Sequence, residues 1–136
     1  MIFKGLETSI TGMAAQRIRI DIASSNLANV NSTRAENGQP YRRKVPVFRA
    51  ILDKEAGVPV YQVRVSKIVA DPSPYKMKYD PKHPDAGPDG YVRLPNVDPL
   101  REMVDMMSAI RTYEANLTAF NTHKDMLLKS LELIRV

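Results

Sequence analysis

All ten prolines of this chain lie between Pro40 and Pro99, and the two long flanking segments contain none. Proline inside a helix costs about 3 kcal/mol, so this distribution separates two arms that can be helical from a middle region that proline interrupts. The chain has 136 residues, which suits one small domain with or without extensions. We therefore predict an α+β protein. Its long N- and C-terminal helices should pack as a coiled-coil-like pair, with a small β-rich and Pro-rich extended region between them.

The predicted organisation has four segments. The middle region begins with β-branched residues, and Gly57 follows a polar stretch that indicates a turn between two strands. Seven prolines then crowd into residues 70–99, where we expect an extended strap with short strands near 75–79 and 91–94. The four segments are an N-terminal helical arm (1–33), a small β region (34–69), a Pro-rich extended strap (70–98) and a C-terminal helix (99–136).

In the first arm, apolar side chains recur at alternating steps of three and four residues, the spacing of a coiled coil. The positions of this stripe are Phe3, Leu6, Ile10, Met13, Arg17, Ile20, Ser24 and Leu27. Gly5 and Gly12 are weak helix formers, so we expect packing against a partner to stabilise the arm.

The C-terminal helix should start at Asp98 and Pro99, because Asp caps helices and Pro fits their first position. Its stripe consists of Met103, Met106, Ile110, Tyr113, Leu117, Phe120, Lys124, Leu127, Leu131 and Ile134. A polar residue in such a seam can fix its register. We therefore expect Arg17 to face an acceptor on the last helix or on a neighbouring subunit, and Glu114 is a candidate.

The net charge of +5 is concentrated in the middle of the chain, where residues 31–98 carry twelve basic and eight acidic side chains. Arg42, Arg43 and Lys44 form the densest basic run. One interpretation is a basic coiled-coil protein that binds nucleic acid. A solvated face, or a surface that meets acidic neighbours, is favoured, because no aromatic side chains interleave the basic ones and both arms are near neutral.

The residues that usually carry catalysis are sparse. The absence of cysteine excludes thiolate chemistry and disulfides. His83 and His123 are far apart in the sequence and in different contexts, and the spacing of Asp80, Asp85 and Asp89 does not match a calcium-binding loop. We predict no enzyme activity, catalytic residue, metal site or cofactor. No apolar run reaches the length of a membrane span, and charged residues interrupt the N-terminal stretch that a cleaved secretory signal would need.

Several motifs resemble those of a known family. The segment Ser24-Ser25-Asn26-Leu27-Ala28-Asn29 is similar to the Asn-Leu-Ala-Asn motif of bacterial flagellar axial proteins. Beyond residue 70 the chain resembles the proximal-rod members of that family over nearly its whole remaining length. This part of the resemblance rests on Asp71-Pro72-Ser73-Pro74, Tyr79-Asp80-Pro81-Lys82-His83-Pro84-Asp85-Ala86, Leu94-Pro95-Asn96-Val97, Glu102-Met103-Val104-Asp105-Met106 and Arg111-Thr112-Tyr113-Glu114-Ala115-Asn116.

The resemblance implies a non-enzymatic subunit of the hollow helical rod that crosses the periplasm in the flagellar basal body. Its implied partners are copies of itself, other flagellar rod proteins and the flagellar type III export apparatus, with no nucleic acid, no direct membrane insertion and no cleaved signal peptide. The terminal helices of this family pack together around a channel. The assembly interface is therefore expected to comprise the apolar residues of the two stripes together with Arg17, Asn26, Asn29, Glu114 and Asn116.

Overall fold

A computed structural model describes residues 2–54, 57 and 59–135. The elements in chain order are α1 (Ile2–Ala28), β1 (Lys44–Asp53), β2 (Val60–Ala70), β3 (Lys76–Tyr79), β4 (Tyr91–Leu94) and α2 (Pro99–Ile134). Two terminal helices with a small antiparallel middle region confirm the predicted α+β class.

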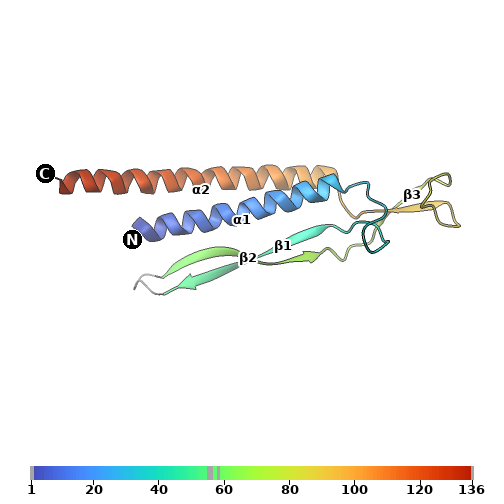
Figure 1. The fold of residues 1–136 in the computed structure, drawn as a ribbon, viewed down its shortest axis with the longest axis horizontal. Coiled ribbons are helices and arrows are strands. Elements are labelled where there is room, and N and C mark those ends of the chain that lie inside the picture. The colour runs from blue at the N-terminus through green and yellow to red at the C-terminus, as the bar shows by residue number, and fades with distance from the viewer. Residues whose placement is uncertain (1, 55–56, 58, 136) are drawn as a thin grey trace.

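The two helices lie side by side and run in opposite directions (Figure 1). Asp98 caps α2 as predicted, since its carboxylate accepts a hydrogen bond from the backbone nitrogen of Leu100 at 3.1 Å and Pro99 occupies the first turn. The interior between the elements is small. Its buried apolar side chains are mostly short, namely Ala15, Ile22, Ala23, Val92, Val97 and Ala109.

The middle region forms two antiparallel hairpins. Strands β1 and β2 pair from Lys44 opposite Ala70 to Asp53 opposite Val60, with a bulge between Val47 and Phe48. The predicted pair of strands is thereby confirmed, although residues 55 and 56 of the predicted turn lie outside the described residues. The short strands expected in the strap are also present. They form the β3–β4 hairpin, which projects beyond the ends of the helices (Figure 1).

Helix α1 lies between α2 and the β1–β2 hairpin (Figure 1). It contacts α2, β1 and β2, whereas α2 touches neither of these two strands within the described residues. This arrangement leaves one side of α2 and one side of the hairpin without a covering element from the same chain.

Candidate assembly interface

Small and polar residues outside the apolar stripes make direct contacts between α1 and α2. One position per heptad of α1, at Gly5, Gly12, Arg19 and Asn26, faces one residue of α2. Gly5 faces His123, Gly12 faces Asn116, Arg19 donates a hydrogen bond to Asp105 at 2.6 Å, and Asn26 donates one to Glu102 at 3.2 Å. Ala109 lies in the same row of α2 and is fully buried. Glycine at two of these positions allows the backbones to approach closely.

The predicted stripe of α2 therefore divides into two rows. Alternate members are half-buried beside the contact with α1, namely Met106, Tyr113, Phe120 and Leu127. The others face solvent: Met103 is 51% exposed, Leu117 is 41% exposed, and Ile110, Lys124, Leu131 and Ile134 are also exposed. Apart from Lys124, this second set is an apolar surface that none of the described residues covers.

The stripe of α1 divides in the same way. Leu6, Met13, Ile20 and Leu27 are half-buried, while Phe3, Ile10, Arg17 and Ser24 are exposed. In both helices, the exposed row is the one that repeats every seven residues from the first stripe position. The sequence pattern identified apolar residues at regular spacing, but it did not distinguish a row that faces the partner helix from a row that faces outward.

Arg17 and Glu114 do not pair within this chain. Both are exposed, and among the described residues neither belongs to an ion pair. Glu114 of the same chain therefore does not accept from Arg17 in this structure, and an acceptor for Arg17 on the last helix or on a neighbouring subunit stays a prediction. The cation that does pair across the helices is Arg19, whose partner is Asp105. The option of an acceptor on a neighbouring subunit is unaffected by this finding.

Asn26 is the centre of a buried polar junction where α1, β1 and α2 meet. Its side-chain nitrogen donates to the backbone oxygen of Lys44 at 2.9 Å and to Glu102, while its oxygen accepts from the Lys44 nitrogen at 3.0 Å and from the Tyr41 hydroxyl at 2.8 Å. Burying an amide is unfavourable unless its groups are paired, and here both donors and the acceptor are used. Asn29 has a local role, because its side chain donates to the backbone oxygen of Ser25.

Arg43 and Glu102 form an ion pair in the same junction, and Glu102 is only 1% exposed. Burial disfavours the charge of Arg43, but hydrogen bonds and attraction from Glu102 and Asp71 outweigh burial and raise the pKa of the guanidinium. Sequence reasoning missed this pair. A glutamate in the first turn of a helix is ordinary, since it complements the helix dipole, so nothing in the pattern marked Glu102 as buried.

Asp71 and Asn96 attach the strap to this junction. Asn96 accepts from the backbone nitrogen of Arg43 at 2.7 Å and donates to the backbone oxygen of Asp71 at 3.1 Å. Hydrogen bonds from the hydroxyl and backbone nitrogen of Ser73, with further contributions from Arg43, lower the pKa of the Asp71 carboxyl. The Asp71-Pro72-Ser73-Pro74 motif is thus a turn that joins β2 to the strap and holds the buried arginine.

Arg42 also has partners within the chain. Its guanidinium lies 4.3 Å from the centre of the Tyr75 ring and donates to the backbone oxygens of Asp71 and Ser73 at 3.0 and 2.9 Å. Two members of the densest basic run are therefore occupied by intramolecular contacts.

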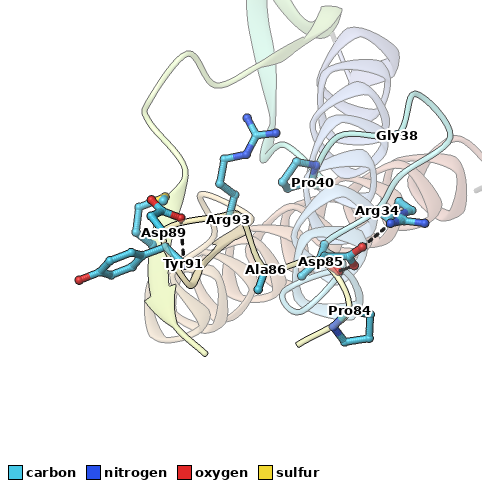
Figure 2. Close-up of a pocket in the computed structure, with 12 residues that line it drawn as sticks. Arg34, Gly38, Pro40, Pro84, Asp85, Ala86, Asp89, Tyr91 and Arg93 are labelled. Carbon is cyan, nitrogen blue, oxygen red and sulfur yellow. Dashed lines mark hydrogen bonds and ion pairs between the residues drawn. The ribbon is translucent and has the colours of Figure 1, made fainter. Parts of the chain in front are cut away.

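A cleft of about 490 Å³ separates the loop after α1 from the β3–β4 hairpin (Figure 2). At one side Asp85 accepts hydrogen bonds from the Thr33 hydroxyl at 2.7 Å and from Arg34. These hydrogen bonds, the one from Thr33 foremost, lower the pKa of the Asp85 carboxyl. They connect Thr33 and Arg34, in the loop after α1, to the turn between β3 and β4. The residues at this side of the cleft therefore have a role in holding the fold together.

The two histidines have local partners on separate elements. His83 accepts from the backbone nitrogen of Asp85 through Nδ1 at 3.0 Å, and Nδ1 of His123 lies 2.9 Å from the backbone oxygen of Ala119. Within the described residues, no group of three or more His, Asp or Glu side chains is arranged to hold a metal ion. Neither helix, over its described length, is long and apolar enough to cross a bilayer.

Comparison with known proteins matches both ends of the chain to flagellar families. Residues 6–35 match the family described as flagella basal body rod protein, and residues 89–133 match the family described as flagellar basal body rod FlgEFG protein C-terminal. The first match covers most of α1, including the Asn-Leu-Ala-Asn motif, and the second covers β4 and nearly all of α2.

Individual relatives cover nearly the whole molecule. The flagellar basal-body rod protein FlgC of Bacillus subtilis is 48% identical, with 96% of this chain and 97% of the relative aligned. FlgC of Aquifex aeolicus is 47% identical over 96% of each chain, and FlgC of Salmonella typhimurium is 44% identical over 90% of each. Identity at this level over both full lengths shows that the chain belongs to the FlgC family of flagellar basal-body rod proteins.

Proposed function

We propose that the chain is a structural, non-enzymatic subunit of the flagellar basal-body rod. It assembles with copies of itself and with other rod proteins into a hollow drive shaft for bacterial motility. The observation that carries this proposal is the similarity to FlgC proteins over nearly the full length of both chains. An elongated molecule with few buried apolar residues and long exposed apolar rows also suits a protein that completes its core by assembly.

The proposed place of the subunit in the rod and its route of export follow from the resemblance to proximal-rod proteins. The subunit belongs to the proximal section of the rod, lies in the periplasm and passes through the flagellar type III export apparatus without a cleaved signal. Its four functional segments are 1–33, 34–69, 70–98 and 99–136, and the terminal helices pack as a coiled-coil-like pair. The antiparallel arrangement of α1 and α2 supports this pairing.

The contacts with neighbouring subunits are assigned to the exposed rows of the helices. On α1 these are Phe3, Ile10 and Arg17, and on α2 they are Met103, Ile110, Glu114, Leu117, Leu131 and Ile134. The half-buried rows, Asn26 and Asn116 support the interface from behind, because they lie where the two helices and the hairpin meet, and Asn29 closes the end of α1 next to them.

The alternative of a nucleic-acid-binding protein has less support. Such a protein needs free Lys and Arg side chains along one face. Here Arg43 is buried in an ion pair and Arg42 lies over an aromatic ring and donates to backbone oxygens. The basic run therefore has a role within the fold.

A deletion strain tests the proposed function. Removing this chain should abolish swimming and leave basal bodies without a complete rod when they are viewed by electron microscopy. Expression of the intact chain should restore both, whereas a variant with Leu117→Asp should restore neither. A deletion strain that swims and has complete rods would refute the proposal.

A further inference from the structure

The β1–β2 hairpin is attached to α1 through polar side chains. Lys4 forms an ion pair with Asp53, and the pairing raises the pKa of the Lys4 ammonium. Gln62 is buried and donates to Glu7 at 2.9 Å. Because Asp53 lies opposite Val60, and Gln62 is two residues further along β2, Asp53 and Gln62 project from the same face of the hairpin. That face is the one bonded to α1.

The opposite face of the hairpin is apolar except at its first pair, Lys44 with Ala70. Directly paired residues share a face, so the register places four apolar cross-strand pairs on the rest of it. They are Pro46 with Ile68, Phe48 with Val65, Ala50 with Val63, and Leu52 with Tyr61. Tyr61 is 62% exposed and Ile68 is 52% exposed. A two-stranded sheet in water normally turns its polar face outward, and here the order is reversed.

We propose that this apolar face binds a second copy of the same chain and packs against the exposed row of α2 in that copy. The proposal rests on the proposed function and specifies which surfaces of neighbouring subunits meet. The row from Met103 to Leu131 is the longest uncovered apolar surface on the helices and spans about 42 Å at 1.5 Å per residue. The hairpin strands span about 33 Å, so the α2 row is long enough to run along the whole hairpin face.

Within one chain these two surfaces cannot meet. Helix α1 lies between them, and α2 touches neither β1 nor β2 in the described part of the chain. The hairpin face and the α2 row therefore each require another molecule. Because they are different surfaces, a single contact leaves a hairpin face free on one copy and an α2 row free on the other, so the contact can repeat head-to-tail from copy to copy. An open-ended assembly is the form that a rod requires.

The size of the hairpin face explains why a copy would not form a stable dimer through it alone. Two strands about 4.8 Å apart and about 33 Å long present roughly 300 Å², whereas a stable interface buries about 800 Å² per partner. A copy inside a stack uses both its hairpin and its α2, but each added copy forms only one such contact. The free protein should therefore be monomeric, and the contact should persist where other contacts within the rod support it.

The absence of cysteine from the sequence allows a direct test. Tyr61→Cys and Leu117→Cys are placed on two differently tagged chains in a deletion strain, and isolated basal bodies are treated with a mild oxidant. We expect a disulfide-linked dimer that carries both tags. A single chain with both substitutions should give a ladder of trimers and longer products, because the contact is head-to-tail. Lys67→Cys in place of Tyr61→Cys is the matched control: Lys67 is exposed but lies on the opposite face, and it should give no dimer.

The outcomes separate this inference from the proposed function. Absence of the unmodified chain from basal bodies would refute the proposed function itself. Incorporation of the cysteine variants without a mixed dimer, a dimer joined at Tyr61 in both copies, or a disulfide to a different protein would overturn only the hairpin contact. If Tyr61→Cys prevents incorporation, Phe48→Cys on the same face replaces it and the same expectations apply.

Discussion

Asn26 and Lys44 are joined by two hydrogen bonds, because the side-chain amide of Asn26 pairs with both the backbone nitrogen and the backbone oxygen of Lys44. This arrangement copies the pairing of one strand with another and attaches the first residue of β1 to the last turn of α1. Asn is the residue that supplies a donor and an acceptor side by side in so short a side chain.

Substitution Asn26→Asp should destabilise the chain strongly. It removes both donors, leaves the Lys44 oxygen without its partner and places a carboxylate beside that of Glu102. An unsatisfied buried polar group costs about 1–3 kcal/mol, and repulsion adds to this. The measurement is urea unfolding followed by circular dichroism. Asn29→Asp is the matched control in the same motif and should have a smaller effect, since the Asn29 side chain bonds only nearby residues of the chain, donating to the Ser25 oxygen and accepting from the Ser32 hydroxyl. An equal loss of unfolding free energy in the two variants would contradict the role given to Asn26.

Substitution Glu102→Ala should lower the free energy of unfolding by about 3–5 kcal/mol, because it leaves the buried charge of Arg43 without its main partner. Glu114→Ala is the control on the same helix and should be nearly neutral, since Glu114 is exposed and unpaired in the described part of the chain. A double variant, Arg43→Met with Glu102→Met, should recover much of the loss. Failure of the double variant to improve on Glu102→Ala would show that the pair acts through something other than charge.

Leu117→Asp and Phe120→Asp should both block rod assembly but differ in their effect on the isolated chain. Leu117 belongs to the exposed row, so its substitution should leave the free energy of unfolding within about 0.5 kcal/mol of the original. Phe120 is half-buried beside α1, and its substitution should also destabilise the fold. Swimming assays and unfolding curves measure the two effects.

His83→Ala and His123→Ala should leave motility largely intact, and loss of swimming in a histidine variant that accumulates normally would contradict the non-enzymatic role.

Gly12→Ala should destabilise the chain although alanine is the better helix former. The added Cβ would lie 2.9 Å from Nδ2 of Asn116, so the helices must separate or Asn116 must move. Such overpacking costs about 1–3 kcal/mol, which exceeds the gain of up to about 1 kcal/mol in helix propensity. Combining Gly12→Ala with Asn116→Ala should restore stability. An increase in thermal midpoint for Gly12→Ala alone would show that the helices do not approach as closely as described.

The contribution of Asp71 to the free energy of unfolding should disappear in acid. Its folded pKa is depressed below the unfolded value of about 3.9, so the folded state binds the proton less tightly than the unfolded state. The stabilisation is therefore complete above about pH 5 and is lost as the pH falls through the folded pKa. Unfolding of the original chain and of Asp71→Asn, compared between pH 7 and pH 3, should show a stability difference that shrinks below about pH 4. Asp125→Asn, an exposed control on α2, should leave the free energy of unfolding at pH 7 nearly unchanged.

The boundaries of the elements could be predicted because their causes are local. Proline excludes helix from the middle region, Asp98 and Pro99 start α2, and β-branched residues mark β1 and β2. The contact between the helices could not be predicted, because a hydrophobic pattern assigns the interior to apolar residues. Here Gly5 and Gly12 permit an approach of the two helices that larger residues would prevent, and one row of each stripe faces outward. The buried pair of Arg43 and Glu102 depends on segments that only the fold brings together.

The junction also determines the order in which the chain can fold. Asn26 and Glu102 are 76 positions apart, and Lys4 and Asp53 are 49 apart, so α1 has its full set of partners only when nearly the whole polypeptide is available. Closing such long loops is slow, because the chain loses conformational entropy before the contacts form. An incomplete chain lacks the contacts between α1 and α2. The long-range hydrogen bonds that join the two helices in the finished subunit therefore form only once the C-terminal helix is present.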